Sequence, residues 1–302
     1  MDRRAFIAGC AVTAGGAVLF PGRAAMAAKT KKEQEVKTGN KMFADAPLRM
    51  SVQPGWFKGK TIDEKLAAIA EWGFPAYEWL GPDGDLDALK AAMDRAGLQL
   101  SCMNGAGAIA PRQMVDPTDH DRVVEQFKER VQTAHKLGCK NLVGLTGNER
   151  TDASHEEQTE YVIQCLKRLA PIAEAEGVTI CLEALNPLVD HQGYFLTRTD
   201  HAMEILQAVN SPNVKMLFDI YHQQITEGNV IRNITQNIAR IGHFHVADNP
   251  GRKQPGTGEL NYKNIFKAIY DTGYQGYVAL ECGKTVSTEE ALTYLRKECL
   301  TW

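Results

Sequence analysis

Short apolar runs alternate with amphipathic helical runs along most of the chain, and this alternation limits the fold more than any other feature. From residue 46 onward, eight such apolar runs are each followed by a stretch whose hydrophobic residues recur at helical spacing. The expected strands are 48–53, 76–80, 99–104, 141–145, 178–183, 214–219, 241–246 and 276–281. The expected helices are 61–72, 85–96, a long one that ends at 137, 155–176, 200–209, 222–237, 261–272 and 287–299.

Glycines mark the junctions between these units. Gly73, Gly97, Gly138 and Gly177 each stand where a helix should end, a left-handed position that suits a residue without a Cβ atom. The expected strands are almost continuously apolar, as in parallel sheets that are buried on both faces. Strand–helix alternation fits an open doubly wound sheet or a closed barrel. Because eight units in roughly 255 residues match the closed form, we predict a single (β/α)8 TIM barrel over residues 46–302.

The first 28 residues differ from the rest. Arg3 and Arg4 precede a mildly apolar run, and small residues up to Ala27 offer a cleavage site. This order is typical of a twin-arginine signal peptide, so we predict export, with the periplasm as destination. An uncleaved N-terminal apolar helix is the alternative. Residues 29–45 are rich in lysine without apolar periodicity, which indicates a flexible linker.

Composition excludes some partners. Hydrophobic residues make up 44% of the chain, enough for a large core. The formal net charge is -3, so no basic excess points to nucleic acid. No run of about 18 apolar residues could span a membrane in the mature protein. The cysteines beyond the signal segment show no paired short spacing, and we expect no structural disulfide. The oligomeric state stays open, a homo-oligomer included.

Four potential metal ligands fall at the ends of consecutive strands. Glu183, Asp219 and Glu281 end the fifth, sixth and eighth expected strands, and His245 lies near the end of the seventh. The carboxyl ends of barrel strands form the catalytic face. A lone acidic residue there is usually a helix cap or an ion-pair partner, but four together predict a shared site.

A divalent cation would resolve the repulsion within this set. Three carboxylates held close together without a counter-charge would be costly to bury. Three carboxylates and one imidazole suit Mg²⁺, Mn²⁺ or Co²⁺, and Zn²⁺ is also compatible. We therefore predict one divalent ion, held by Glu183, Asp219, His245 and Glu281.

Several motifs carry a resemblance to a known family. They are Leu-Glu-Ala-Leu-Asn at 182–186, Phe-Asp-Ile-Tyr-His at 218–222, His-Phe-His-Val-Ala-Asp at 243–248 and Leu-Glu-Cys at 280–282. They resemble the xylose isomerase-like barrel superfamily over about residues 46–300. Asp-Asn-Pro-Gly-Arg at 248–252, followed by Pro-Gly-Thr-Gly-Glu-Leu-Asn-Tyr at 255–262, is similar to the hydroxypyruvate isomerase branch.

This resemblance implies an isomerase that works by proton transfer through an enediolate. Glu183 and Glu281 would be the catalytic pair, one removing a proton beside the carbonyl and the other returning it. Asp219 and His245 would act as ligands only. The implied substrate is a small keto acid or keto sugar, converted to its aldehyde isomer as hydroxypyruvate is to tartronate semialdehyde.

Six further residues are substrate-contact candidates. They are His222, Arg252, Glu259, Trp56, Asn104 and Asn186. The imidazole of His222 would meet a substrate oxygen, although a place in the first turn of the sixth helix is as good an interpretation. Arg252 would grip a carboxylate with two hydrogen bonds, or else be a solvated loop residue. Glu259 would brace the loop that carries Arg252 or close it over the site.

Departures from the branch leave the substrate open. His245 stands where the branch usually carries Gln, Lys253-Gln254 replaces His-Glu, and residues 51–57 lack an acidic residue. A His at the metal position resembles the keto-sugar 3-epimerases, which are our first alternative. A 3-keto-sugar lyase and a non-catalytic sugar-binding protein are further alternatives, and the intact glutamate pair argues against the last.

Overall fold

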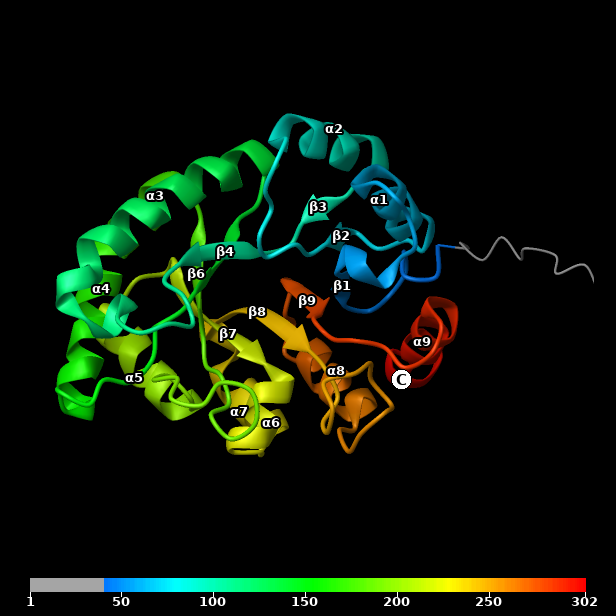
Figure 1. Cartoon of the computed structure of the whole chain (residues 1–302). Helices are drawn as coiled ribbons and strands as arrows, with labels where there is room; N and C mark the ends of the chain where they lie inside the picture. Colours follow the sequence, from blue (N-terminus) through cyan, green and yellow to red (C-terminus); the bar gives the residue numbers. More distant parts are fainter. Residues whose placement is uncertain (1–40) are drawn as a thin grey trace, which may run out of the picture. The chain divides into compact units, whose positions relative to one another are not determined.

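The computed structural model describes residues 41–302 (Figure 1). The predicted signal peptide and the linker up to residue 40 lie outside the described residues. Residues 41–45, the last part of the predicted linker, pack on the folded domain. Phe43 is buried, its ring stacks on Phe74 at a centroid distance of 4.3 Å, and its backbone N–H donates to Trp72 O at 2.9 Å. An aromatic residue thus holds this segment in place despite the surrounding lysines.

Nine parallel strands form one sheet that nearly closes on itself. In chain order they are β1 (Arg49–Val52), β2 (Ala76–Tyr77), β3 (Gln99–Leu100), β4 (Met103–Ala106), β5 (Asn141–Gly144), β6 (Thr179–Glu183), β7 (Val214–Asp219), β8 (Ile241–Val246) and β9 (Tyr277–Leu280). The order across the sheet is β3-β2-β1-β9-β8-β7-β6-β5-β4. The two edge strands are halves of the third predicted strand, separated by Ser101 and Cys102. The two edges of the nearly closed sheet are therefore consecutive in the chain, and the barrel prediction is confirmed.

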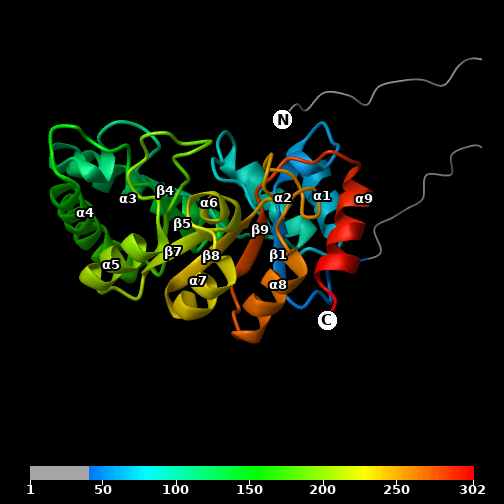
Figure 2. The same ribbon diagram turned by 90° about the horizontal axis from the view of Figure 1, so that it is seen from below.

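Helices cover the outside of the barrel, and α4 and α5 lie side by side in both views (Figures 1 and 2). The helices are α1 (Ile62–Glu71), α2 (Leu86–Ala96), α3 (His120–Leu137), α4 (His155–Glu176), α5 (Thr199–Val209), α6 (Ile220–Thr226), α7 (Val230–Asn237), α8 (Tyr262–Asp271) and α9 (Thr288–Tyr294). The predicted helix 222–237 is two helices, because Gly228 and Asn229 adopt positive φ angles of 61° and 54° between them. Gly97, Gly138 and Gly177 are left-handed C-caps, as predicted.

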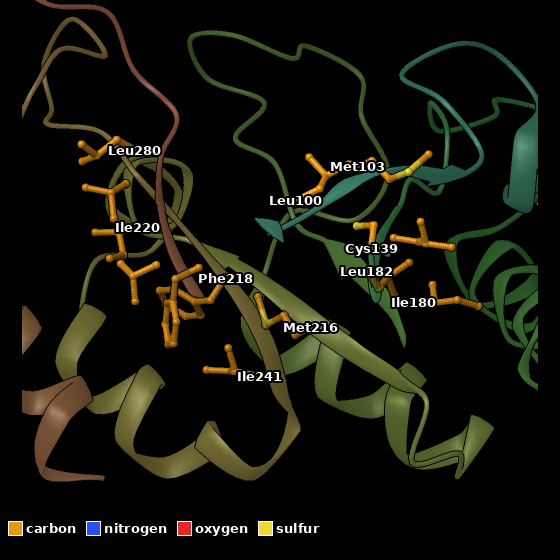
Figure 3. Close-up of a cluster of buried hydrophobic side chains, with 14 of the residues drawn as sticks. Leu100, Met103, Cys139, Ile180, Leu182, Met216, Phe218, Ile220, Ile241 and Leu280 are labelled. Atoms are coloured by element: carbon orange, nitrogen blue, oxygen red, sulfur yellow. The ribbon is translucent and has the colours of Figure 1, made fainter. Parts of the chain in front are cut away.

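The two faces of each strand have different neighbours, and this difference positions the site. Leu182, Met216 and Phe218 belong to the large hydrophobic core, and Figure 3 shows Met216 and Phe218 of β7 with Ile241 of the adjacent β8. Side chains alternate along a strand. Residues at the intervening positions, Cys181 and Leu217, form a separate small cluster instead. Among the predicted metal ligands, Glu183 lies two residues after Cys181 and Asp219 two residues after Leu217, so these side chains are on the same strand faces as the small cluster. The predicted ligands and the small cluster therefore share the barrel interior.

Two further properties concern the whole described part of the chain. All six of its cysteines are free thiols, and five of them are buried. Among residues 41–302, the structure has no helix with the length and apolar character needed to cross a bilayer.

Candidate active site

The structure brings the four predicted metal ligands together. Glu183, Asp219, His245 and Glu281 each offer one ligand atom, and these atoms lie within 4.8 Å of one another. His245 Nδ1 lies 3.2 Å from Glu183 Oε1 and 3.2 Å from Glu281 Oε2. The first three residues are buried and Glu281 is partly exposed. The cluster stands at the carboxyl ends of β6 to β9, the end at which barrel enzymes carry their chemistry.

Asp219 serves the fold and the cluster at once. It is the N-cap of α6, and its Oδ1 accepts hydrogen bonds from the backbone N–H groups of Tyr221 at 2.8 Å and His222 at 3.2 Å. Its other oxygen, Oδ2, lies 3.5 Å from His222 Nε2 and 3.8 Å from the Arg252 guanidinium. Helix capping thus fixes the carboxylate and leaves one oxygen directed at the cluster.

The cluster concentrates negative charge. Burial raises the pKa of Glu183, and the charges of Glu281 and Asp219 raise it further against the opposing effect of His245. Burial alone would raise the pKa of Glu281, but His245 and Arg252 outweigh it and lower this pKa to about 2. Burial alone would lower the pKa of His245, but the carboxylates of Glu78 and Glu281 raise it well above its ordinary value. Such a donor set fits a divalent cation, whose charge would offset that of the carboxylates.

A cavity of about 420 Å³ adjoins the cluster, within the range of small-molecule sites. Its polar lining consists of Asn104, Gln126, Arg130, Glu183, His191, His222, Arg252 and Glu281. Its apolar lining includes Leu80, Ile109, Val143, Leu145 and Leu185. Three of the six predicted substrate contacts, His222, Asn104 and Arg252, therefore line the same cavity as both catalytic candidates.

His222 has a defined orientation. The Asn186 side-chain amide donates to His222 Nδ1 at 2.6 Å, and the Asn186 backbone N–H also points at this atom from 3.3 Å. Because Nδ1 accepts, the proton of the neutral imidazole is on Nε2, which has no other hydrogen-bond partner among the described residues. The Nε2–H group is thus available to a substrate oxygen.

Asn186, a predicted substrate contact, is not among the residues that line the cavity, and its side chain contacts His222 instead. It is fully buried, and its Oδ1 accepts from the backbone N–H groups of Val189 at 2.9 Å and Asp190 at 3.1 Å. The side chain holds both the loop after β6 and the ring of His222. Strand-end position alone could not distinguish this inward-facing brace from a residue that meets the substrate.

Two other predicted contacts lie outside the cavity lining. Trp56 is buried in the turn after β1, and its indole N–H donates to Cys282 O at 2.8 Å, so it is a packing residue. Glu259 is exposed, and its Oε1 accepts from Asn249 Nδ2 at 2.8 Å and Gln224 Nε2 at 3.3 Å. Glu259 therefore braces its loop, which is one of the two roles considered for it, and it does not line the cavity.

Arg252 faces carboxylates of the cluster. Its guanidinium donates to Glu281 Oε2 at 2.8 Å, and its charged carbon lies 5.4 Å from the centre of the Tyr221 ring. The loop that carries it is organised by the buried Asp248. The carboxylate of Asp248 accepts four backbone N–H bonds, from Asn249 at 3.0 Å, Gly256 at 2.8 Å, Thr257 at 3.1 Å and Leu260 at 3.2 Å.

Sequence reasoning missed three polar residues of the cavity, His191, Gln126 and Arg130. Gln126 and Arg130 are four residues apart and therefore share one face of α3. None of the ion pairs within residues 41–302 involves Arg130. The four-residue spacing of Gln126 and Arg130 is visible in the sequence, but polar residues on a solvent-exposed helix face have the same spacing. The sequence alone therefore does not distinguish a cavity wall from an exposed surface.

Comparison with known proteins identifies the family. The sequence model of the xylose isomerase-like TIM barrels matches residues 66–298. The chain belongs to this family. Hydroxypyruvate isomerase of Escherichia coli K12 is 31% identical, over 76% of this chain and 91% of its own length. The 2-oxo-tetronate isomerase of Cupriavidus necator is 32% identical, over 77% of this chain and 91% of its own length.

Solved structures show the same fold. A family 2 AP endonuclease from Brucella melitensis superposes with a TM-score of 0.74 at 24% identity, covering 83% of this chain and 99% of that one. The 3-keto-D-glucoside 4-epimerase of E. coli gives a TM-score of 0.71 at 24% identity, covering 82% and 99%. The family's barrel thus occurs in proteins named for different reactions, so the activity must be argued from the site.

Proposed function

We propose that the protein is a metal-dependent isomerase that interconverts a small keto acid of the hydroxypyruvate type with its aldehyde isomer. The observation that carries the proposal is the pair Glu183 and Glu281, whose carboxylates both line one cavity and both lie 3.2 Å from His245 Nδ1. The isomerase names of the relatives agree with it. Two carboxylates beside one substrate can remove a proton from one carbon and deliver it to the next.

The four-residue cluster would hold the metal through Glu183, Asp219, Glu281 and His245 Nδ1. When bound there, a divalent ion supplies Lewis-acid polarisation of the substrate carbonyl. The oxygen-rich donor set suits Mg²⁺, Mn²⁺ or Co²⁺, and the imidazole also admits Zn²⁺.

The protein residues carry out the proton transfer. One glutamate of the pair, ionised, removes the proton from the hydroxyl-bearing carbon beside the carbonyl, and the other, protonated, delivers a proton to the former carbonyl carbon. The proton of that hydroxyl passes to the former carbonyl oxygen, so that the hydroxyl carbon becomes the aldehyde. His222 donates its Nε2–H to the substrate oxygen that becomes negative. Arg252 keeps the carboxylate of Glu281 in place through their 2.8 Å hydrogen bond. The apolar wall of Leu80, Val143 and Leu145 keeps water from the reacting carbons.

An anionic substrate accounts for the cationic lining of the cavity. Arg252 is bonded to Glu281, whereas Arg130 has no ion-pair partner within residues 41–302 and is free to bind a carboxylate. Gln126 is beside it on α3, and its buried Oε1, an acceptor without a hydrogen-bond partner among the described residues, would accept from a substrate hydroxyl rather than bind the carboxylate. We therefore assign the carboxylate grip, which the sequence suggested for Arg252, to Arg130.

A keto-sugar 3-epimerase is the second candidate. The imidazole of His245 in the donor set favours it, as does the end of β1, where Val52 and Gln53 offer no carboxylate. A reversible proton transfer at a single carbon would use the same glutamate pair. The charge of the substrate separates the two candidates, because a neutral keto sugar gives Arg130 no partner.

Proton exchange with solvent tests the proposal. The Mg²⁺-loaded enzyme is incubated in D₂O with hydroxypyruvate, a 2-oxo-tetronate and a panel of ketohexoses, and ¹H NMR follows the reaction. We expect deuterium at the carbon beside the carbonyl of a keto acid, together with its aldehyde isomer. Epimer formation with exchange at C3 of a ketohexose would select the second candidate. No exchange in any substrate would refute proton transfer at this site.

A further inference from the structure

A buried carboxylate outside the described cluster faces the back of its histidine ligand. Glu78 directly follows β2 and is fully buried. Its Oε2 accepts a hydrogen bond from His243 Nε2 at 2.7 Å, and its Oε1 lies 3.3 Å from His245 Nε2. His243 and His245 are alternate residues of β8, and their rings stand nearly perpendicular, 86° apart, with centroids 5.2 Å apart. One carboxylate therefore meets two imidazoles on the inner side of the barrel.

The two ring nitrogens of His245 point to different groups. Nδ1 faces Glu183 and Glu281 in the cluster, and Nε2 faces Glu78. The 3.3 Å contact to Glu78 is not aligned as a hydrogen bond, yet neither Glu78 Oε1 nor His245 Nε2 has a hydrogen-bond partner elsewhere in residues 41–302. Two buried polar atoms without other partners are costly unless they bond to each other. Each is therefore the natural partner of the other.

We propose that Glu78 is a positioning residue of the metal centre, holding the Nε2–H of His245 so that the Nδ1 lone pair is directed at the ion. A neutral imidazole carries one proton, and the group that binds it decides which nitrogen is left to coordinate. Carboxylates behind metal-bound histidines fix both the tautomer and the ring orientation. The inference rests on the proposed metal centre, and assigns Glu78 a part in it without placing it in contact with substrate.

His243 completes the arrangement. By donating to Oε2, it fixes the rotation of the Glu78 carboxylate and leaves Oε1 for His245. Glu78, His243 and Cys102 also offer ligand atoms within 4.8 Å of one another, which raises the alternative of a second ion. The 2.7 Å separation of Oε2 and Nε2 is that of a hydrogen bond with the proton between the two atoms. We therefore interpret the group as a hydrogen-bonded support.

Metal affinity tests the role. Glu78→Gln keeps the size of the side chain, but its amide cannot accept from both imidazoles. Mn²⁺ is titrated calorimetrically into metal-free wild type and variant, and thermal unfolding of both metal-free proteins is measured alongside. We expect the variant's Kd for Mn²⁺ to rise about 10- to 100-fold, the range for such outer partners.

A matched control separates metal positioning from general stability. Asp116 is another buried carboxylate, bonded to Thr118 and paired with Arg150, and it belongs to neither cluster. Asp116→Asn should lower the Tm of the metal-free protein and leave the Kd for Mn²⁺ unchanged. A Glu78→Gln variant that behaves in the same way, with a lower Tm and a wild-type Kd, would show a purely structural Glu78 and overturn the inference.

The remaining outcomes are equally decisive. Wild-type protein that binds no Mn²⁺ would refute the metal centre itself, a failure distinct from that of Glu78. Two bound ions in the wild type and one in Glu78→Gln would place a second ion at Glu78 and replace the inference. If the variant does not fold, ¹⁵N NMR of histidine-labelled, Mg²⁺-loaded wild type decides: we expect His245 to carry its proton on Nε2, and a proton on Nδ1 would contradict the proposal.

Discussion

At the scale of single residues, the proposed role of Glu183 and Glu281 as a proton-transfer pair can be separated from their proposed role as metal ligands. Glu281→Gln and Glu183→Gln keep an oxygen for coordination but lose the ability to accept a proton. We expect turnover to fall by about 10²- to 10⁴-fold, with the Kd for Mn²⁺ changing far less. Glu204→Gln, on the exposed face of α5, is the control and should retain activity. A Glu281→Gln enzyme that exchanges substrate protons at the wild-type rate would remove this residue from the mechanism.

Substitution of Arg130 tests whether the substrate carries a negative charge. Arg130→Met should raise KM for the keto acid about tenfold or more while leaving kcat nearly unchanged, because a charged hydrogen bond contributes about 1.5–3 kcal/mol. Arg252→Lys should lower kcat as well, since Arg252 bonds to Glu281. Lys128→Met, on the solvent side of the same helix, is the control. An unchanged KM in Arg130→Met would indicate a neutral keto sugar.

The clustering of the four proposed metal ligands was predictable because their positions follow from strand ends alone. Strand ends do not reveal which way a neighbouring side chain turns, so the sequence could not show that Asn186 and Trp56 form hydrogen bonds with the protein backbone. Glu78 was overlooked because it stands inside the predicted strand 76–80, which in the structure ends at Tyr77. Its meaning depends on His243, distant in sequence but adjacent across the barrel interior.

At the scale of elements, the loop after β8 depends on Asp248. This buried carboxylate accepts four backbone N–H bonds, so Asp248→Ala should leave several buried donors without partners. We expect the free energy of unfolding, from urea denaturation, to fall by about 2–3 kcal/mol, and kcat to fall because Arg252 loses its support. Asp271→Ala removes only an exposed ion pair with Lys267 and should change stability little. Equal stability of Asp248→Ala and wild type would contradict this account of the loop.

Element boundaries were predictable where local chemistry determines them. The glycine C-caps of α2, α3 and α4 are confirmed, because the left-handed conformation is a local demand. The break between α6 and α7 is marked in the sequence by Gly228-Asn229, two residues that readily adopt positive φ angles. We nevertheless predicted one helix there, because the hydrophobic residues on both sides recur at helical spacing. The division of the third strand into β3 and β4 had none, since Ser101 and Cys102 are as compatible with a strand as their neighbours are. The break between β3 and β4 is set by the tertiary structure, in which β3 pairs with β2 and β4 pairs with β5 at opposite edges of the sheet.

At the scale of the whole molecule, the eight-unit barrel was predictable because count and length leave few alternatives, whereas the destination of the chain remains a proposal. We propose export through the twin-arginine route. Arg3→Lys combined with Arg4→Lys should retain the protein in the cytoplasm with its N-terminal segment uncleaved, as shown by cell fractionation and mass spectrometry. Lys31→Arg with Lys32→Arg, in the linker, should be exported normally. If the variant that combines Arg3→Lys and Arg4→Lys is found outside the inner membrane in its processed form, this route is disproved.

The central claim is that Glu183, Asp219, His245 and Glu281 form one working metal centre, and elemental analysis of purified protein tests it most directly. We expect about one divalent ion per chain, because the four ligand atoms lie within 4.8 Å of one another. Chelation should remove the ion together with the isomerase activity, and added Mg²⁺ or Mn²⁺ should restore it. Protein that contains no divalent metal and keeps its full activity in EDTA would contradict the claim.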